Sequence, residues 1–292
     1  MIFTRFLFLL KRFKYLCVLN TIIYNMIKTI QHFVHQLFEH RNLIENLTKR
    51  DFSAKYVKNY FGIAWAILDP LFFILILYFV FHYRFGTIET LGVPFVTYLI
   101  TGYISYNLFS NALTSVTACI KEYSFLNKKV NFDAAIIPIV KLLSEYLMHF
   151  IIIIIVMILL WIAGITPTWL WFQVLYFQFA LFMFMVGCGW ITSSIALFFP
   201  DIKNIIGIIT RLMFFITPIF WSMESLPEEY TKILKLNPIV YIVQGYRDSF
   251  LFNKPFWNDF DYLLYFWVWT ILLIVIGIVV FRKLRPHFAD VI

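Results

Sequence analysis

The sequence has few charged residues for its length. Only 14% of its 292 residues are Asp, Glu, Lys or Arg, whereas about 25% is usual in soluble domains. Hydrophobic residues make up 62% of the chain and aromatic residues 21%, and no long polar block interrupts them. The shortage of charge excludes an ordinary soluble protein, and the missing polar block leaves no room for a separate soluble domain.

The sequence also lacks motifs for chemistry of its own. None of its ten glycines is followed by Lys, so the phosphate-binding pattern G-x-x-x-x-G-K-[ST] cannot be formed. The patterns H-E-x-x-H, C-x-x-C and G-x-S-x-G are absent as well. We therefore expect that the chain does not hydrolyse ATP alone, and that energy for any uphill transport comes from a partner protein or an ion gradient.

Cysteine is too sparse for metal or redox chemistry. The three cysteines, Cys17, Cys119 and Cys188, are far apart in apolar surroundings, with neither zinc-ligand spacing nor an obvious disulfide partner. We interpret them as small hydrophobic residues. We expect no cofactor and no metal site in this chain.

Hydrophobic segments dominate what is present. About 20 apolar residues in a helix cross the ~30 Å hydrocarbon core of a bilayer. Six segments approach or reach this length: residues 61–82, 94–117, 137–162, 170–199, 206–222 and 262–281. The sequence therefore predicts an all-α, multi-pass membrane protein with six transmembrane helices.

The basic residues indicate how these helices are oriented. If both termini are cytoplasmic, 17 Lys and Arg fall in inside segments and 5 in outside segments, which satisfies the positive-inside rule. Ten of the 24 basic residues lie in residues 1–60, beside membrane-seeking sequence, so anionic lipid is a simpler partner than nucleic acid for the net charge of +8. We expect cytoplasmic N- and C-termini.

A basic amphipathic segment leads into the first hydrophobic run. In residues 49–60, KRDFSAKYVKNY, cations are interspersed with Phe and Tyr, which suits the headgroup layer. Residues 1–40 are similarly basic and rich in Phe and Leu, but their apolar runs are too short to cross a membrane and no cleavage site follows. This extension either forms an amphipathic helix on the inner leaflet or partly precedes a true initiator at Met26.

The connection before the last hydrophobic segment is unusually apolar. Residues 224–250 contain the block IVYIV, which is too short to span a membrane and typical of a re-entrant or interfacial segment. We predict two short helices broken at Asn237-Pro238 that dip into the outer leaflet and line a cavity, with Ile239 and Val243 buried and Gly245 at a turn. The alternative is a loop packed on the outer surface.

Four acidic or basic residues other than histidine fall inside the expected spans: Asp69, Lys141, Glu145 and Arg211. Such residues are costly in a membrane and are candidates for function. Lys141 and Glu145 are four apart and would share a helix face, so they could form a structural ion pair or take part in transport. Asp69 could instead accept hydrogen bonds from amides freed by the kink at Pro70.

Aromatic residues offer flat surfaces on which sugar rings could stack. Trp65 lies near the start of the first span, and Tyr106 and Phe109 lie deep in the second beside Asn107 and Asn111. We predict that these aromatics line a polar, sugar-compatible wall. Other aromatics near span ends are expected interfacial anchors, namely Trp161, Trp169, Trp171 and Trp221.

The predicted cytoplasmic connection between the second and third spans reads KEYSFLNKKVNFDAAIIP. It offers charged and amide groups to a soluble partner, namely Lys121, Glu122, Asn127 and Lys128. Its apolar residues favour a docking helix over a solvated loop, and the solvated loop is the alternative.

These features together resemble the membrane subunits of ABC exporters for polysaccharides and polyol phosphates, the permeases for O-antigen, capsule and wall teichoic acid. The similar segments are spread over residues 40–292: RDFSAKY, YFGIAWAILDP, GVPFVTYLITG, LNKKVNFDAAIIP, FFPDI, FFITPIFW, LNPIVYIVQGYRDSF and FADVI. No single segment is specific, but their order and spacing are.

The resemblance implies a bacterial inner-membrane protein in which residues 41–292 form the transmembrane domain of a homodimer. It also implies two copies of an ABC ATPase subunit bound underneath, which would hold the ATP and magnesium. Three groups of residues are implied to be functional: Arg50, Asp51, Lys55 and Tyr56 in an amphipathic gate helix; Lys121, Glu122, Asn127 and Lys128 in a coupling helix; and Trp65, Tyr106, Phe109, Tyr241 and Tyr246 along the polymer path.

The implied function is export of a lipid-linked polysaccharide or teichoic-acid-type polymer across the cytoplasmic membrane, driven by a separate ATPase. Two alternatives stay open. One is a drug or lipid ABC permease of the same fold. The other is a membrane-embedded acyl- or glycosyltransferase that uses Asp69, Glu145 or a histidine, although the sequence shows no cluster of acid, base or acceptor residues for it.

Overall fold

The computed structural model describes residues 31, 35–56, 61–62, 64–85, 89–90, 92–124 and 133–291. The chain divides into two compact units, Met1–Leu47 and Thr48–Ile292. In the first unit, the imidazole of His35 lies 3.6 Å from the carboxylate of Glu39 one helical turn later. The second unit contains nearly all of the expected membrane domain.

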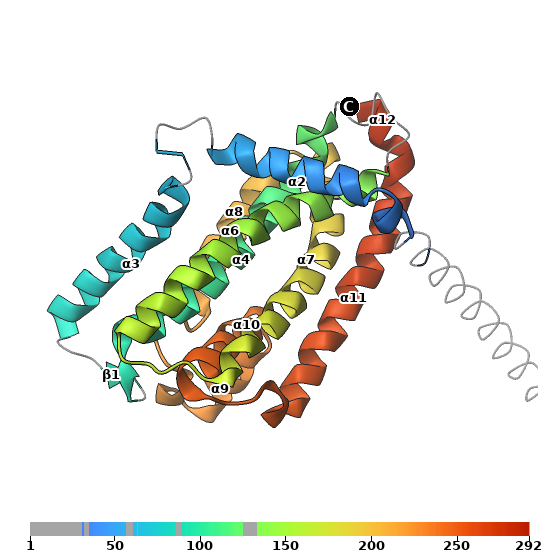
Figure 1. The fold of residues 1–292 in the computed structure, drawn as a ribbon. Helices are drawn as coiled ribbons and strands as arrows, with labels where there is room; N and C mark the ends of the chain where they lie inside the picture. Colours follow the sequence, from blue (N-terminus) through green and yellow to red (C-terminus); the bar gives the residue numbers. More distant parts are fainter. Residues whose placement is uncertain are drawn as a thin grey trace, which may run out of the picture. The chain divides into compact units, whose positions relative to one another are not determined.

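The described part of the chain is mostly helical (Figure 1). The longer helices are α2 (Arg41–Tyr56), α3 (Ala64–Phe85), α4 (Phe95–Glu122), α6 (Ile137–Ile162), α7 (Gln173–Phe198), α8 (Ile202–Ile216), α9 (Glu228–Lys235), α10 (Pro238–Arg247) and α11 (Phe260–Leu284). Short elements complete the fold: the antiparallel pair β1 (Glu89–Thr90) and β2 (Val93–Pro94), a π-helical turn η4 (Asp248–Phe252), the 3-10 turns η1 (Ala134–Ile136), η2 (Trp169–Phe172), η3 (Met223–Ser225), η5 (Phe256–Asn258) and η6 (Arg285–His287), and α12 (Phe288–Val291).

Three helices among the described residues are long and apolar enough to cross a membrane. They are Ala134–Ile162, Trp169–Phe198 and Phe260–His287, with mean hydropathies of 2.5, 1.8 and 2.7. They coincide with the third, fourth and sixth predicted spans, which are therefore confirmed as apolar helices of spanning length. Helices α3 and α4 overlap the first two predicted spans.

The predicted bounds of the fifth span, residues 206–222, are wrong at both ends. Helix α8 begins at Ile202 and ends at Ile216, and Thr217 is already extended. Proline disfavours helical backbone in the residue before it and has no N–H to donate. Pro218 therefore ends the helix several residues before the apolar sequence ends.

Helices α7 and α11 pack against one another along their length (Figure 1, yellow and orange). A Cβ added to Gly187 of α7 would lie 2.8 Å from the backbone of Ile274, and one added to Gly277 of α11 would lie 2.9 Å from the Gly187 carbonyl oxygen. Small residues at such positions let helix backbones approach closely, which is how helices associate in lipid. Helix α4 packs against α6 and α7 to complete the centre of the bundle.

Two short helices, α9 and α10, follow α8 as the sequence predicted (Figure 1). The break between them is at Asn237-Pro238, where the Asn237 side chain accepts a hydrogen bond from the N–H of Ile239 and Pro238 occupies the first turn. Ile239 and Val243 are buried, at 1% and 0% exposure, where α10 packs on α4, α7 and α11. The predicted pair of helices, their break and the burial of these two residues are confirmed.

Gly245 does not mark a turn, contrary to the prediction. It lies inside α10, and a Cβ placed on it would come 2.1 Å from the ring of Phe177 on α7. The missing side chain thus serves close packing between two helices rather than a change of chain direction.

Gly245→Ala should therefore destabilise the protein. The added methyl has no space beside the Phe177 ring, and overpacking of this kind costs about 1–3 kcal/mol. Gly207→Ala is the matched control, because its Cβ would meet only the end of the flexible Arg211 side chain at 3.9 Å and alanine favours a helix by about 0.5–1 kcal/mol.

The measurement is the thermal unfolding midpoint of each purified variant in detergent. Gly245→Ala should unfold at a lower temperature than the unmodified chain and Gly207→Ala at the same or a higher one. Equal midpoints for the two variants would contradict the close contact between α10 and α7.

Candidate functional site

A network of ion pairs joins α2 to the start of α6 and the end of α4. The Lys141 ammonium lies 2.8 Å from the Asp51 carboxylate and 2.9 Å from the Glu122 carboxylate. The Tyr123 hydroxyl donates a 2.8 Å hydrogen bond to Asp51. Three helices are thus held together through Lys141, whose side chain is 13% exposed.

One turn further along, the Lys55 ammonium donates to both carboxylate oxygens of Glu145, at 2.9 and 2.8 Å. Glu145 is only 6% exposed, and a buried carboxylate is costly without a partner. Lys55 and Asp51 are four apart on α2, as Glu145 and Lys141 are on α6. The two helices therefore present opposite charges in matching register.

The predicted ion pair within α6 is replaced by these contacts between helices. Lys141 and Glu145 share a face of α6 as the sequence indicated, but each binds a residue of opposite charge on α2. Of the other residues proposed for the gate helix, Arg50 is exposed, and the side chain of Tyr56 lies outside the described residues.

The residues proposed for coupling are only partly described. Lys121 is exposed at the end of α4, whereas Glu122 is half-exposed and already paired with Lys141. Asn127 and Lys128 lie outside the described residues. The Glu122 carboxylate therefore belongs to the ion-pair network. Lys121, at the same end of α4, has a solvent-exposed side chain.

A pocket of about 290 Å³ lies beside the Lys55–Glu145 pair, between helices α3, α4 and α6. We call it the inner pocket. It is lined mainly by polar and aromatic side chains, namely Lys55, Trp65, Asp69, Asn107, Asn111, Glu145 and His149. The Asn111 amide donates to the Asn107 amide oxygen over 3.1 Å. Polar groups of this number on apolar helices mark a candidate path for a hydrophilic substrate.

Only one of the three aromatic residues predicted for this wall lines it. Trp65 is 46% exposed and borders the inner pocket. Tyr106 and Phe109 are each 3% exposed, and the Tyr106 hydroxyl donates to the Thr210 carbonyl on α8. The two amides, Asn107 and Asn111, line the pocket instead, because Tyr106 and Phe109 face the neighbouring helices.

The two tyrosines predicted to face a polymer exit have different surroundings. Tyr241 borders a second, larger pocket, and its hydroxyl lies 3.1 Å from that of Tyr176. Tyr246 has no exposed surface, and its hydroxyl lies 2.9 Å from Nε2 of His149. Tyr246 is therefore buried in the protein interior and lines neither pocket.

His149 was not singled out by the sequence. It is four residues after Glu145 on the same face of α6, lines the inner pocket and contacts Tyr246 of α10. Lys141, Glu145 and His149 thus form a polar stripe, one residue per turn, that binds α2 near its start and α10 further along. The sequence does contain a signal for this stripe, since three ionisable groups follow one another at four-residue spacing in an apolar helix.

Arg247 is the other residue that the sequence did not reveal. It is fully buried, and its two terminal nitrogens each donate over 2.6 Å to the carbonyls of Pro218 and Ile219. The guanidinium also lies 3.6 Å from the centre of the Tyr98 ring, in cation–π geometry. A Cβ on Gly102 would lie 2.5 Å from this guanidinium, so glycine there makes room for it.

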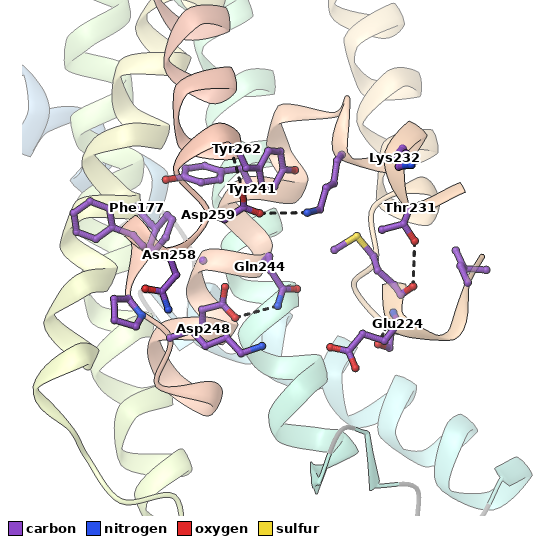
Figure 2. Close-up of a pocket in the computed structure, with 18 of the residues that line it drawn as sticks. Phe177, Glu224, Thr231, Lys232, Tyr241, Gln244, Asp248, Asn258, Asp259 and Tyr262 are labelled. Carbon is purple, nitrogen blue, oxygen red and sulfur yellow. Dashed lines mark hydrogen bonds and ion pairs between the residues drawn. The ribbon is translucent and has the colours of Figure 1, made fainter. Parts of the chain in front are cut away.

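The larger pocket lies where α7 and α11 begin, at the opposite end from the ion-pair network, and Figure 2 shows it. Its volume is about 850 Å³, and we call it the outer pocket. Within it, the Gln244 amide donates to the Asp248 carboxylate over 3.2 Å. Asp248 follows α10, outside the three apolar spanning helices, and burial raises the pKa of its carboxyl group to about 6.

The described residues offer no metal site, since nowhere in them do three His, Cys, Asp or Glu side chains gather closely enough to hold an ion. What the geometry offers is two polar cavities near opposite ends of an apolar bundle. Each cavity has polar groups that can bind a hydrophilic molecule.

Comparison with known proteins gives one matching family and several relatives. The model of the family described as ABC-2 type transporter matches residues 42–251. The O-antigen export system permease protein RfbA of Klebsiella pneumoniae is 27% identical over 86% of this chain and 95% of its own length. The polysialic acid transport protein KpsM of Escherichia coli is 25% identical over 82% and 92%. The capsule polysaccharide export inner-membrane protein CtrC of Neisseria meningitidis serogroup A is 21% identical over 86% and 94%.

The Lys55–Glu145 pair can be tested by removing one partner and then both. Lys55→Met should lower the free energy of unfolding by about 1–3 kcal/mol, because it leaves the buried Glu145 carboxylate without this partner. The double variant Lys55→Met/Glu145→Met should recover part of that loss, since no charge then remains to be neutralised.

Lys232→Met is the control, because Lys232 and its partner Glu228 are 78% and 91% exposed and such pairs contribute little. The unfolding midpoint in detergent measures all three variants. A double variant that unfolds at the same temperature as Lys55→Met, or at a lower one, would show that the two charges do not stabilise one another.

Proposed function

This chain belongs to the ABC-2 type transporter family, and we propose that it is the permease subunit of an exporter for a lipid-linked saccharide polymer. The observation that carries the proposal is its similarity, over more than four-fifths of its length, to permeases named for O-antigen, polysialic acid and capsule polysaccharide. The inner pocket supports it, because the indole of Trp65 and the amides of Asn107 and Asn111 suit a sugar with hydroxyl groups and apolar ring faces.

The proposed topology has six transmembrane helices, α3, α4, α6, α7, α8 and α11, with both termini in the cytoplasm. Three of them have the length and hydropathy of spanning helices. The excess of Lys and Arg in the segments placed inside supports the orientation. The ion-pair network then lies at the cytoplasmic face of the inner membrane, and the outer pocket at the opposite face.

In this topology, α2 lies at the cytoplasmic interface and α9 and α10 at the outer end of the path. The two ion pairs between α2 and α6, Lys55–Glu145 and Asp51–Lys141, support a gate role for α2. If both pairs exchanged partners together, α2 would move as one body. The break at Asn237-Pro238 supports a similar role for α10. Broken helices at a transport path are recurrent in membrane transporters.

Energy comes from a separate ABC ATPase in two copies, which binds a homodimer of this chain and holds the ATP and magnesium. The absence of a phosphate-binding loop in the sequence supports this division of labour. The proposed contact with the ATPase is the end of α4 and the segment that follows it. It begins with Lys121 and Glu122, the last two residues of α4, and includes Asn127 and Lys128.

A membrane-embedded acyl- or glycosyltransferase remains the alternative from another class. It would need acid, base or acceptor groups around a cavity. The inner pocket holds Asp69, Glu145 and His149, but Glu145 is bound to Lys55 and His149 to Tyr246, so their polar atoms serve structure. A drug or lipid permease of the same fold would need a largely apolar path, which the two amides do not provide.

Removing the amides from the inner pocket should reduce export. We expect Asn107→Ala/Asn111→Ala to lower the amount of polymer at the cell surface about tenfold or more, because two or more hydrogen bonds to the passing saccharide, each worth about 1 kcal/mol, are lost. The protein level in the membrane should not change, since Asn111 is exposed. Ser110→Ala is the matched control on the same helix, at a residue that does not line the pocket.

The measurement is surface polysaccharide in a strain that depends on this chain, with the membrane content of each variant quantified alongside. Unchanged surface polymer in the double variant would show that the inner pocket is not on the path. Loss of polymer in the Ser110 control as well would point to misfolding of α4.

The contact with the ATPase can be tested by charge reversal. Lys121→Glu/Lys128→Glu should weaken co-purification of the ATPase and lower export, because both residues belong to the proposed docking segment. Lys121 is not part of the Lys141 network, so the ion pairs that hold α4 to α6 stay intact. Lys203→Glu, at the start of α8, provides a control reversal of an exposed lysine. Full co-purification and export by the double variant would remove this segment from the ATPase contact.

A further inference from the structure

The outer pocket is lined by successive parts of one stretch of chain, namely the segment 222–226, α9, α10, and the turn η5 with the start of α11. Tyr98 of α4 and Phe177 of α7 complete its wall from distant parts of the sequence. Figure 2 shows Tyr241 and Tyr262 close together on one side, Gln244 and Asp248 in the middle, and Glu224 and Thr231 on the far side. A volume of about 850 Å³ is within the usual range of small-molecule sites, about 300–1,000 Å³.

The position of the pocket is marked by two exposed tryptophans. Trp169 and Trp257 are 68% and 50% exposed, and their rings stack with centres 6.4 Å apart. Exposed Trp at the ends of apolar helices is typical of the headgroup layer of a membrane. Asn258 and Asp259, which line the pocket, directly follow Trp257, so the pocket opens at headgroup level.

The charges in the pocket disfavour a multivalent anion as the ligand. Three lysines and four carboxylates line it, and part of this charge is already neutralised within the protein. Lys235 lies 3.3 Å from Asp259, and Lys232 lies 3.7 Å from Glu228. Sites for phosphate usually gather cations without facing carboxylates. The pocket therefore suits a ligand with no strong net charge.

The remaining chemistry suits a saccharide. Tyr241 and Tyr262 meet edge to face with ring centres 5.2 Å apart, and they line one wall together with Phe177 and Phe256. Phe177 and Tyr241 are 2% and 5% exposed, so it is the half-buried rings of Phe256 and Tyr262 that offer apolar surface to the C–H side of a sugar ring. Amide and carboxylate groups, here Gln244, Asn258 and Asp259, can donate to and accept from its hydroxyls.

We propose that the outer pocket is a binding site for a neutral saccharide unit at the level of the outer headgroups, formed by α9, α10 and the start of α11. This proposal rests on the proposed function, because it assumes that saccharide reaches this side of the membrane through the chain. It adds to that function a second sugar site, separate from the inner pocket, that holds the emerging polymer where it leaves the membrane.

Site-specific photocrosslinking tests the proposal in cells that carry the complete exporter. A benzophenone amino acid replaces Lys232 or Asn258, both of which line the pocket. The matched control replaces Ile233, which neighbours Lys232 on α9 but is 63% exposed and does not line the pocket. After irradiation, the purified chain is stained for saccharide by periodate and hydrazide, and a parallel culture is labelled with radioactive phosphate.

Saccharide-positive adducts from Lys232 and Asn258, and none from Ile233, are the expected result. Adding Gln244→Ala should reduce the adduct at Lys232 about fivefold, because one hydrogen bond worth about 1 kcal/mol is lost. Adducts that carry phosphate but no saccharide would overturn the proposal in favour of a phospholipid headgroup.

Surface polymer is measured in the same strains with the unmodified chain. Polymer at the surface without saccharide adducts in the pocket would overturn this inference and leave the proposed function standing. No surface polymer, in cells where the chain and its ATPase are both present, would overturn the proposed function and this inference with it.

Discussion

The arrangement of this chain depends on the cost of leaving a charged or polar side chain unpaired in an apolar bundle. Lys141, Glu145 and His149 follow one another at one-turn intervals along α6, and each contacts another helix. Lys141 binds Asp51 of α2 and Glu122 of α4. Glu145 binds Lys55 of α2, and His149 contacts Tyr246 of α10. Helices α2, α4 and α10 are therefore fixed to α6 by polar contacts. In lipid, where apolar packing alone does not discriminate between neighbours, such contacts determine which helices meet.

The same requirement fixes α10 near the other end of the bundle. Three successive residues attach it to three neighbours: Gly245 packs on Phe177 of α7, Tyr246 bonds to His149 of α6, and Arg247 binds the carbonyls left free where α8 ends. Through this contact, Tyr246 joins α10 to His149 in the wall of the inner pocket. In the proposed exporter, α6 therefore contacts both the cytoplasmic helix α2 and the outer helix α10.

The sequence predicted the features that depend on composition and local chemistry. The long apolar helices follow from hydropathy, and the break between α9 and α10 follows from the capping side chain of Asn237 and the ring of Pro238. It could not predict features that depend on which helices are neighbours. Periodicity placed Lys141 and Glu145 on one face of α6 but did not identify α2 as the helix that this face meets. Likewise, Tyr106 and Asn107 are adjacent in sequence, and only the packed bundle shows that the tyrosine faces α8 and the amide faces the pocket.

ATP-driven transfer of a lipid-linked saccharide by the purified components tests the central claim most directly. The chain and its partner ATPase would be reconstituted into liposomes, and the appearance of saccharide in the lumen would be followed with an enclosed glycosidase. Transfer is expected only when both proteins and ATP are present, and this chain alone should not hydrolyse ATP. Hydrolysis by the isolated chain, or a complex that hydrolyses ATP without moving the saccharide, would contradict this claim.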